Sequence, residues 1–330
     1  MKKKHVFIIV LLTVMLTATV CYIGYSLNNR PRIVTFVGQD MGPSFYSMID
    51  DADRQLWDAC IAGDLKAVKR FYDKNGDVNK FTNVGNMSVL HIAVMGGNPA
   101  VIEFLIDKGC DVNAKTHEGN TALNTAVRAQ IIEAVRMLLA KGADPGSKPC
   151  SQMHDIYEAC DMKSPLSICC QNGNLEIAKL LVEFGAPIPD KTVPLVIAAA
   201  AHGKTGIVRF LLEHGADVNE SFNSPCHVGK MQPYLDDLGV NESEKGSSSA
   251  LHIAVMLGNI ELVRLLAVSG ANLEQPDEEG KRALDNVIQA DDKKMVLTLI
   301  DLGAKVLQRM ADEARSDAVK EVLESHIKTI

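Results

Sequence analysis

Apolar and polar residues recur in one pattern, which is clearest between residues 249 and 273. Ser249 precedes a short apolar run, Ala250 to Ala254, and serine favours a helix start because its hydroxyl can accept a hydrogen bond from a free backbone amide of the first turn. Gly258 and Asn259 then interrupt the pattern as a turn would. A second apolar helix face follows at helical spacing, in Leu262, Leu265 and Leu266. Gly270 stands where helices often end in the left-handed conformation, so the pattern predicts helix, turn, helix and loop.

The same pattern occurs in other parts of the chain. Copies of its first segment lie at residues 55–59, 88–93, 121–126, 164–169, 193–198 and 282–285. The marker leucine advances by 34 residues from Leu56 to Leu90, and by 33 from Leu251 to Leu284. Self-similarity at a fixed period of this length indicates a repeat architecture, in which each unit buries its apolar face against its neighbours. The sequence therefore predicts about seven repeats.

These residues resemble the ankyrin repeat, whose unit of about 33 residues carries a Thr-Pro-Leu-His-x-Ala signature. Ser88 to Ala93 and Ser249 to Ala254 match the signature most closely, and Gly109 to Asn113 and Gly215 to Asn219 match the family's repeat ending. The resemblance covers residues 53–307. It implies an all-α ankyrin-repeat solenoid, made of helix-turn-helix units with β-hairpin loops, and a binding surface for another protein. The last copy departs from the pattern at its cap and histidine positions.

Two insertions interrupt the period, near residues 144–163 and 220–248. The marker leucines are 43 residues apart from Leu123 to Leu166 and 56 apart from Leu195 to Leu251. Both insertions fall after a second helix and before the next cap, where the resemblance places the β-hairpin finger. Insertions in repeat proteins often lie on the binding face, and long loops are functional or disordered. Recognition fingers and tolerated insertions both remain open. After the last repeat, residues 308–330 are predicted to form a capping helix, because terminal repeats need a polar outer face.

The N-terminus carries a membrane signal. Residues 1–5 are basic, residues 6–27 are almost entirely apolar, and residues 28–52 show no helical period and are interpreted as a linker. An apolar run of this length suits a single transmembrane helix, and a cleaved signal peptide is the alternative. The excess of lysine before the run favours a cytoplasmic N-terminus. The repeats would then lie on the extracytoplasmic side. This is the periplasm if the protein is bacterial, as the short basic start suggests, and the secretory lumen or cell exterior if it is eukaryotic. After cleavage of the segment the repeats would instead be secreted.

Charge and motifs argue against several functions. The formal charge is −7, which disfavours nucleic acid because phosphate binding requires clustered Lys and Arg. His202 to Thr205 resembles the end of a phosphate-binding loop, but the required glycine is replaced by Ala198. Neither a zinc-hydrolase motif nor a nucleophile elbow occurs. We therefore expect no enzyme activity and no cofactor, and the resemblance assigns His91 and His252 a structural hydrogen bond.

The chain has eight cysteines. Cys60, Cys169 and Cys170 fall on predicted repeat helices, where buried cysteine behaves as a small hydrophobe. Cys150 and Cys160 both belong to the first insertion, and in an oxidising compartment a disulfide between them would stiffen that loop. A metal site formed by these two cysteines and His154 has no standard zinc spacing, so no metal is predicted.

The leading hypothesis is a protein-binding scaffold without catalysis. Its alternatives are a secreted effector that binds a host protein, and a small-molecule or metal-binding protein that uses the insertions. Partner-binding positions are expected at finger and helix-start positions that the resemblance leaves free. These are His117, Glu118, Asn120, Asp277, Glu278, Glu279 and Lys281, with Phe222 and Tyr234 from the long insertion. Trp57, the only tryptophan, is expected to pack in the first repeat.

Overall fold

A computed structural model of the chain describes residues 51–75, 79, 86–117, 119–147, 164–188, 194–220, 249–277 and 279–327. These residues form helices and turns, and they divide into two compact units, unit 1 ending in the sequence at Ala143 and unit 2 beginning at Asp144. Residues 1–50, most of the two insertions and the tip residues Glu118 and Glu278 lie outside the described ranges. Across those ranges, none of the helices is both long and apolar enough to cross a bilayer. The apolar run 6–27 is not among them.

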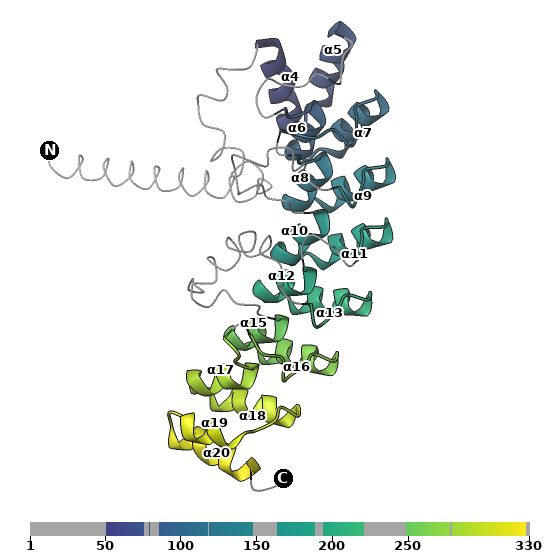
Figure 1. The fold of residues 1–330 in the computed structure, drawn as a ribbon. Helices are drawn as coiled ribbons and strands as arrows, with labels where there is room; N and C mark the ends of the chain where they lie inside the picture. Colours follow the sequence, from purple (N-terminus) through teal and green to yellow (C-terminus); the bar gives the residue numbers. More distant parts are fainter. Residues whose placement is uncertain are drawn as a thin grey trace, which may run out of the picture. The chain divides into compact units, whose positions relative to one another are not determined.

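Unit 1 is built from consecutive helix pairs. The pairs are α4 (Asp51–Ala62) with α5 (Leu65–Asn75), α6 (Val89–Gly96) with α7 (Pro99–Asp107), and α8 (Ala122–Arg128) with α9 (Ile132–Ala140). Within unit 1 the first helices α4, α6 and α8 pack in one layer and the second helices α5, α7 and α9 in another (Figure 1). The helix-turn-helix repeat expected from the sequence is confirmed here.

Unit 2 continues the same plan. Its pairs are α10 (Pro165–Asn172) with α11 (Leu175–Glu183), α12 (Leu195–Ala201) with α13 (Thr205–Glu213), α15 (Ala250–Met256) with α16 (Ile260–Val268), and α17 (Ala283–Ala290) with α18 (Lys293–Asp301). A last pair, α19 (Gln308–Glu313) and α20 (Asp317–Ile327), packs on α17 and α18. This pair lies in the segment for which the sequence predicts a helical cap.

The core runs between the two helix layers of each unit. First helices bury more of their residues than second helices do, and all residues of α12 are buried. The marker leucines are buried in the same way, with Leu251 2% exposed. Trp57 is 1% exposed, which confirms that it packs in the first repeat. Because successive repeats within each unit cover one another, the apolar helix faces that the sequence shows are the buried faces.

Helix ends follow the sequence with one exception. Gly270 has a φ of 91°, a left-handed conformation that glycine adopts without strain. Asn259 caps α16, since its side chain accepts a hydrogen bond from the Leu262 amide at 3.0 Å. The expectation that Ser249 caps α15 through its hydroxyl is wrong. The Ser249 hydroxyl pairs instead with the buried ring of His252, 2.9 Å from its Nδ1, and makes no cap bond.

An asparagine ladder joins adjacent repeats. Asn79 Nδ2 donates to the Gly109 carbonyl at 2.9 Å, and its Oδ1 accepts from the Asp111 amide at 3.0 Å. Asn219 makes the same two bonds, to the Gly270 carbonyl at 3.2 Å and from the Asn272 amide at 2.8 Å. The second pair links residues on either side of the long insertion. The repeats before and after residues 220–248 therefore stack with the ordinary bonding of the fold.

Candidate functional site

Two loops between repeats are described apart from one residue each, Glu118 and Glu278, and we call them finger turns: residues 116–120 and 277–281. In the first, the Thr116 amide donates to the Asn120 carbonyl at 2.9 Å, and the Asn120 amide donates to Thr116 Oγ1 at 3.1 Å. In the second, the Asp277 amide donates to the Lys281 carbonyl at 2.8 Å, and the Lys281 amide donates to Asp277 Oδ1 at 2.8 Å. Each turn is closed by its own first side chain, a short polar group that suits this role.

The β-hairpins expected at these loops are not extended strands. In the part of the chain that the structure describes, the second finger turn carries an isolated antiparallel bridge between Pro276 and Arg282. Only five residues lie between the two, so the loop has room for the turn and one pairing. The side chain of residue 277 replaces further strand pairing, because its carboxylate also accepts the Glu279 amide at 3.0 Å.

Buried histidines attach the finger turns to the preceding repeats. His91 Nε2 lies 3.0 Å from the Asn120 carbonyl, and His252 Nε2 lies 3.3 Å from the Lys281 carbonyl. A carbonyl oxygen only accepts, so Nε2 carries the proton in both rings. In His91 the unprotonated Nδ1 accepts from the Ser88 amide at 3.2 Å. Burial lowers the pKa of both imidazoles and keeps them neutral. This confirms the structural role that the sequence assigns to them.

The predicted partner-binding residues fall into three groups. His117 and Glu279 are exposed at the tips of the finger turns. Asn120, Asp277 and Lys281 use their backbone or carboxylate to build the same turns, and the Lys281 ammonium lies 2.7 Å from the Glu279 carboxylate. The remaining residues, Glu118, Phe222, Tyr234 and Glu278, lie outside the described ranges. Partner binding by any of them stays a prediction.

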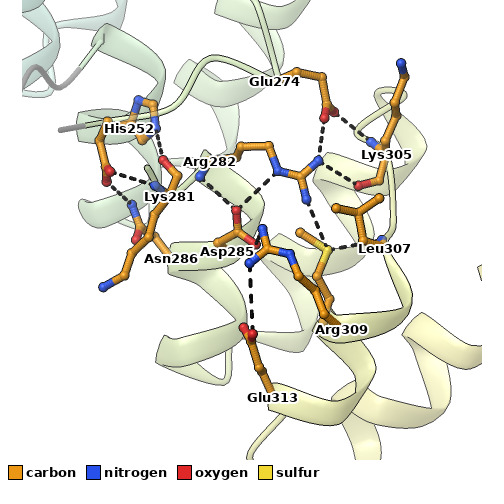
Figure 2. Close-up of polar contacts among 12 residues, drawn as sticks. His252, Glu274, Lys281, Arg282, Asp285, Asn286, Lys305, Leu307, Arg309 and Glu313 are labelled. Carbon is orange, nitrogen blue, oxygen red and sulfur yellow. Dashed lines mark hydrogen bonds and ion pairs between the residues drawn. The ribbon is translucent and has the colours of Figure 1, made fainter. Parts of the chain in front are cut away.

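A polar cluster that the sequence did not predict joins the last repeat to the C-terminal helix pair (Figure 2). Asp285 occupies the signature histidine position. Its Oδ2 accepts from the Arg282 amide at 2.8 Å and from Arg282 Nε at 3.2 Å, and its Oδ1 accepts from Arg309 Nη2 at 3.2 Å. The Arg282 guanidinium also pairs with Glu274 and donates to the Lys305 carbonyl at 3.3 Å. Arg282 is 11% exposed and Asp285 4%, so the ion pair is largely removed from solvent.

Glu274 explains how this cluster fits the repeat plan. It stands four residues after Gly270, at the position that Asn219 holds after Gly215. Its Oε1 accepts from the Lys305 amide at 2.8 Å, as Asn219 accepts from the Asn272 amide. The second carboxylate oxygen is then available for Arg282. The only sequence signal for this cluster was the departure of residues 282 and 285 from the repeat pattern.

The described cysteines are buried thiols, and the described residues form neither a metal cluster nor a phosphate loop. Cys60, Cys110, Cys169 and Cys170 are reduced and buried, and burial raises the pKa of the Cys60 thiol to about 12. The described ranges hold no group of three or more His, Cys, Asp or Glu arranged to bind a metal. The proposed disulfide between Cys150 and Cys160 lies outside them. Residues 202–205 connect helices α12 and α13, which is not the strand-to-helix setting of a phosphate loop.

Comparison with known proteins identifies the repeats. A family model described as ankyrin repeats in three copies matches residues 56–149, 150–221 and 229–310. The chain belongs to the ankyrin repeat family. The ankyrin repeat domain of human ASB11 matches with 25% identity and a TM-score of 0.57, over 76% of this chain and 98% of that one. That of Bcl-3, a member of the IkappaB family, matches with 25% identity and a TM-score of 0.55, over 83% of this chain and all of the other.

Curated relatives of this ankyrin chain include much longer proteins. The E3 ubiquitin-protein ligase KEG of Arabidopsis thaliana is 27% identical over 290 residues, which are 79% of this chain and 17% of KEG. Human transient receptor potential cation channel subfamily A member 1 is 26% identical over 293 residues, 79% of this chain and 25% of the channel. The mouse B-cell lymphoma 3 protein homolog is 28% identical over 175 residues, 49% of this chain and 36% of that protein. The chain thus spans well under half the length of these relatives.

Proposed function

We propose that this chain is a non-catalytic scaffold whose ankyrin repeats bind another protein through their finger turns. The observation that carries the proposal is the way each finger turn is held. Its backbone is closed by its own side chain and attached to a buried histidine of the preceding repeat, while the tip residues His117 and Glu279 are exposed. A loop fixed in this way loses little entropy when a partner docks, which favours affinity.

The buried polar groups of the described repeats support a binding role over catalysis. His91 and His252 use both ring nitrogens in internal hydrogen bonds, and Asp285 is held by two arginines. A general base or nucleophile needs an accessible lone pair within reach of a substrate. In these three side chains the hydrogen-bonding and charged groups already bind other parts of the fold.

We place the scaffold at a membrane through residues 6–27, with the N-terminus cytoplasmic and the repeats on the extracytoplasmic side. The length of the apolar run and the lysines before it support this topology. The periplasm of a bacterium is the compartment that this arrangement favours. Cleavage of the same segment and secretion toward a host protein is the alternative. Alkaline carbonate extraction separates the two, because an anchored chain stays with the membranes and a cleaved chain appears in the supernatant or medium.

The long insertion offers a matched test of partner binding. Seven residues lie between Glu274 and Arg282 in the loop that contains the second finger turn. Deletion of residues 222–243 leaves seven residues between Asn219 and Ser249, the corresponding positions on either side of the long insertion. The ladder from Asn219 to Gly270 and Asn272 lies outside the deleted segment, so the stack is expected to survive. Crosslinking in intact cells followed by affinity capture should then enrich one protein with the full chain and lose it with the deletion. Equal recovery of that protein with both chains would contradict a role for the insertion.

A second variant separates the insertion from the finger turns. His117→Ala combined with Glu279→Ala removes two exposed tips and leaves the turn-closing bonds of Thr116 and Asp277 in place. The unfolding free energy should change by no more than about 0.5 kcal/mol, as for other surface substitutions. Capture of the partner should fall. Unchanged capture by both the deletion and the tip variant would contradict the scaffold proposal.

A further inference from the structure

Helix α5, the second helix of the first repeat, differs in charge from the other second helices described. We call these second helices the outer helices. Four basic residues of α5 are exposed and recur at helical spacing along one face: Lys66, Lys69, Arg70 and Lys74. Residues three and four apart share a helix face, so the four ammonium and guanidinium groups point to the same side. Asp73 is the only acidic residue of the helix. Among the later second helices, α7 carries only the acidic residues Glu103 and Asp107. The others mix both signs, as Glu176, Lys179 and Glu183 do in α11.

Aromatic contacts extend this basic face onto the next repeat. Tyr72 of α5 and Phe104 of α7 meet edge to face, with ring centroids 5.8 Å apart. Lys69 Nζ lies 5.5 Å from the Phe104 ring, and Lys108 Nζ lies 4.8 Å from the Tyr72 ring. Cation–π contacts of this length hold lysine heads over ring faces. Lys108, just beyond the end of α7, thereby joins the face, and we call Lys66, Lys69, Arg70, Lys74 and Lys108 the basic face.

Acidic neighbours reduce its charge only in part. Asp64 is exposed and caps α5, Asp73 lies on α5 itself, and Glu103 and Asp107 are exposed on α7. Asp107 is already paired with Lys141 at 2.8 Å. Apart from the paired Asp107, five basic groups therefore stand against three acidic groups, on a chain whose total charge is −7. The excess is local, so the surface is suited to an anionic partner that approaches the outer helices of the first two repeats.

We infer that the basic face docks on the anionic headgroups of the bilayer that holds the chain, an inference that rests on the membrane tether proposed above. Only 23 residues separate Leu27 from Asp51. Such a segment reaches at most about 80 Å when fully extended, which keeps the first repeat at an effective concentration on the order of 1 mM at the bilayer. Each net positive charge near an anionic surface multiplies the binding constant by about five, so a net charge of two raises it about 25-fold.

Lysine labelling in nanodiscs tests this docking on the full chain. The chain is placed in discs of phosphatidylcholine alone or with about 30% phosphatidylglycerol, pulsed with an amine-acylating reagent, and mapped by mass spectrometry. We expect Lys66, Lys69 and Lys74 to react at least about threefold more slowly in the anionic discs. Lys179 and Lys320, which are exposed elsewhere, should react at the same rate in both. Protection should disappear near 1 M salt, where the Debye length falls to about 3 Å.

Charge-reversal variants supply the matched control. Lys66→Glu with Arg70→Glu should abolish the protection of Lys69 and Lys74. Lys293→Glu with Lys294→Glu, on the outer helix α18, should leave it intact. Equal labelling of Lys69 in both lipids, on a chain that stays in the disc, would overturn the docking but leave the tether standing. Release of the chain by alkaline carbonate would overturn the tether and this inference together. Protection by soluble polyglutamate, with none from phosphatidylglycerol, would assign the face to an acidic polypeptide instead.

Discussion

Replacing Asp285 with alanine should loosen the C-terminal helix pair by about 3 kcal/mol. The carboxylate accepts three hydrogen bonds, two from Arg282 and one from Arg309. Breaking a buried ion pair from one side costs about 3 to 5 kcal/mol. Glu274 still neutralises Arg282 in the variant, which places the expected loss at the lower end of that range. The contribution of Arg309 is small, because its side chain is 53% exposed and exposed pairs contribute about 1 kcal/mol or less.

Three further variants calibrate this value. Asp285→Asn keeps an oxygen for the Arg282 amide and loses the charge, so it should cost about half as much as alanine. Asp285→His restores the signature residue of the family and should also destabilise. A histidine that donates from Nε2 meets the guanidinium donors of Arg282, whereas His252 meets a carbonyl. Arg309→Ala should change stability by less than about 1 kcal/mol.

Native-state hydrogen exchange locates the effect. Because repeats contact only their neighbours, amides of α19 and α20 should exchange about a hundredfold faster in Asp285→Ala, which corresponds to about 3 kcal/mol of local stability. Amides of α10 to α13 should keep their protection. Unchanged exchange in α19 and α20 would show that the polar cluster does not hold the helix pair. A gain in protection with Asp285→His would refute the explanation given for the departure from the family pattern.

Three other predictions concern the core, the histidines and the thiols. Leu251→Ala should lower the unfolding free energy by about 2 to 5 kcal/mol through a core cavity, whereas Met256→Ala, 44% exposed, should change it little in the same urea titration. Burial lowers the pKa of His91 and His252, so the unfolded chain binds more protons below about pH 6.5 and stability should fall from pH 7 toward pH 5; His91→Asn with His252→Asn should flatten that slope. Since burial raises the pKa of Cys60 to about 12, iodoacetamide at pH 8 should modify it in urea but not in the native protein, as peptide mass spectrometry would show.

The fold followed from the sequence because its signals are local and repeated. Helix starts, interhelical turns and the burial of Trp57 and Leu251 depend on apolar residues a few positions apart. The asparagine ladder was harder to predict, since Asn219 bonds to residues 51 and 53 positions away. The polar cluster was harder still to predict. The sequence shows that Asp285 departs from the repeat pattern, but it does not show the partners of Asp285. One of them, Arg309, lies 24 positions further along the chain and belongs to no repeat motif.

The hydrogen bonds relate the residue at the signature histidine position to the loop that follows the repeat. His91 and His252 precede finger turns of ordinary length and bond to their last carbonyls. The repeats that lead into the two insertions carry Asn124 and Val196 at the same position. In the two described finger turns, the signature histidine therefore accompanies the family geometry.

Site-directed photocrosslinking tests most directly whether the tips of the finger turns, His117 and Glu279, bind a protein partner. A photoreactive phenylalanine analogue is placed at His117 or Glu279, and, as a matched control on an exposed outer helix, at Lys179. The account predicts one discrete adduct of the same protein from both tip positions and none from the control. An adduct from Lys179 alone, or no adduct from either tip in cells where Lys179 is crosslinked, would contradict it.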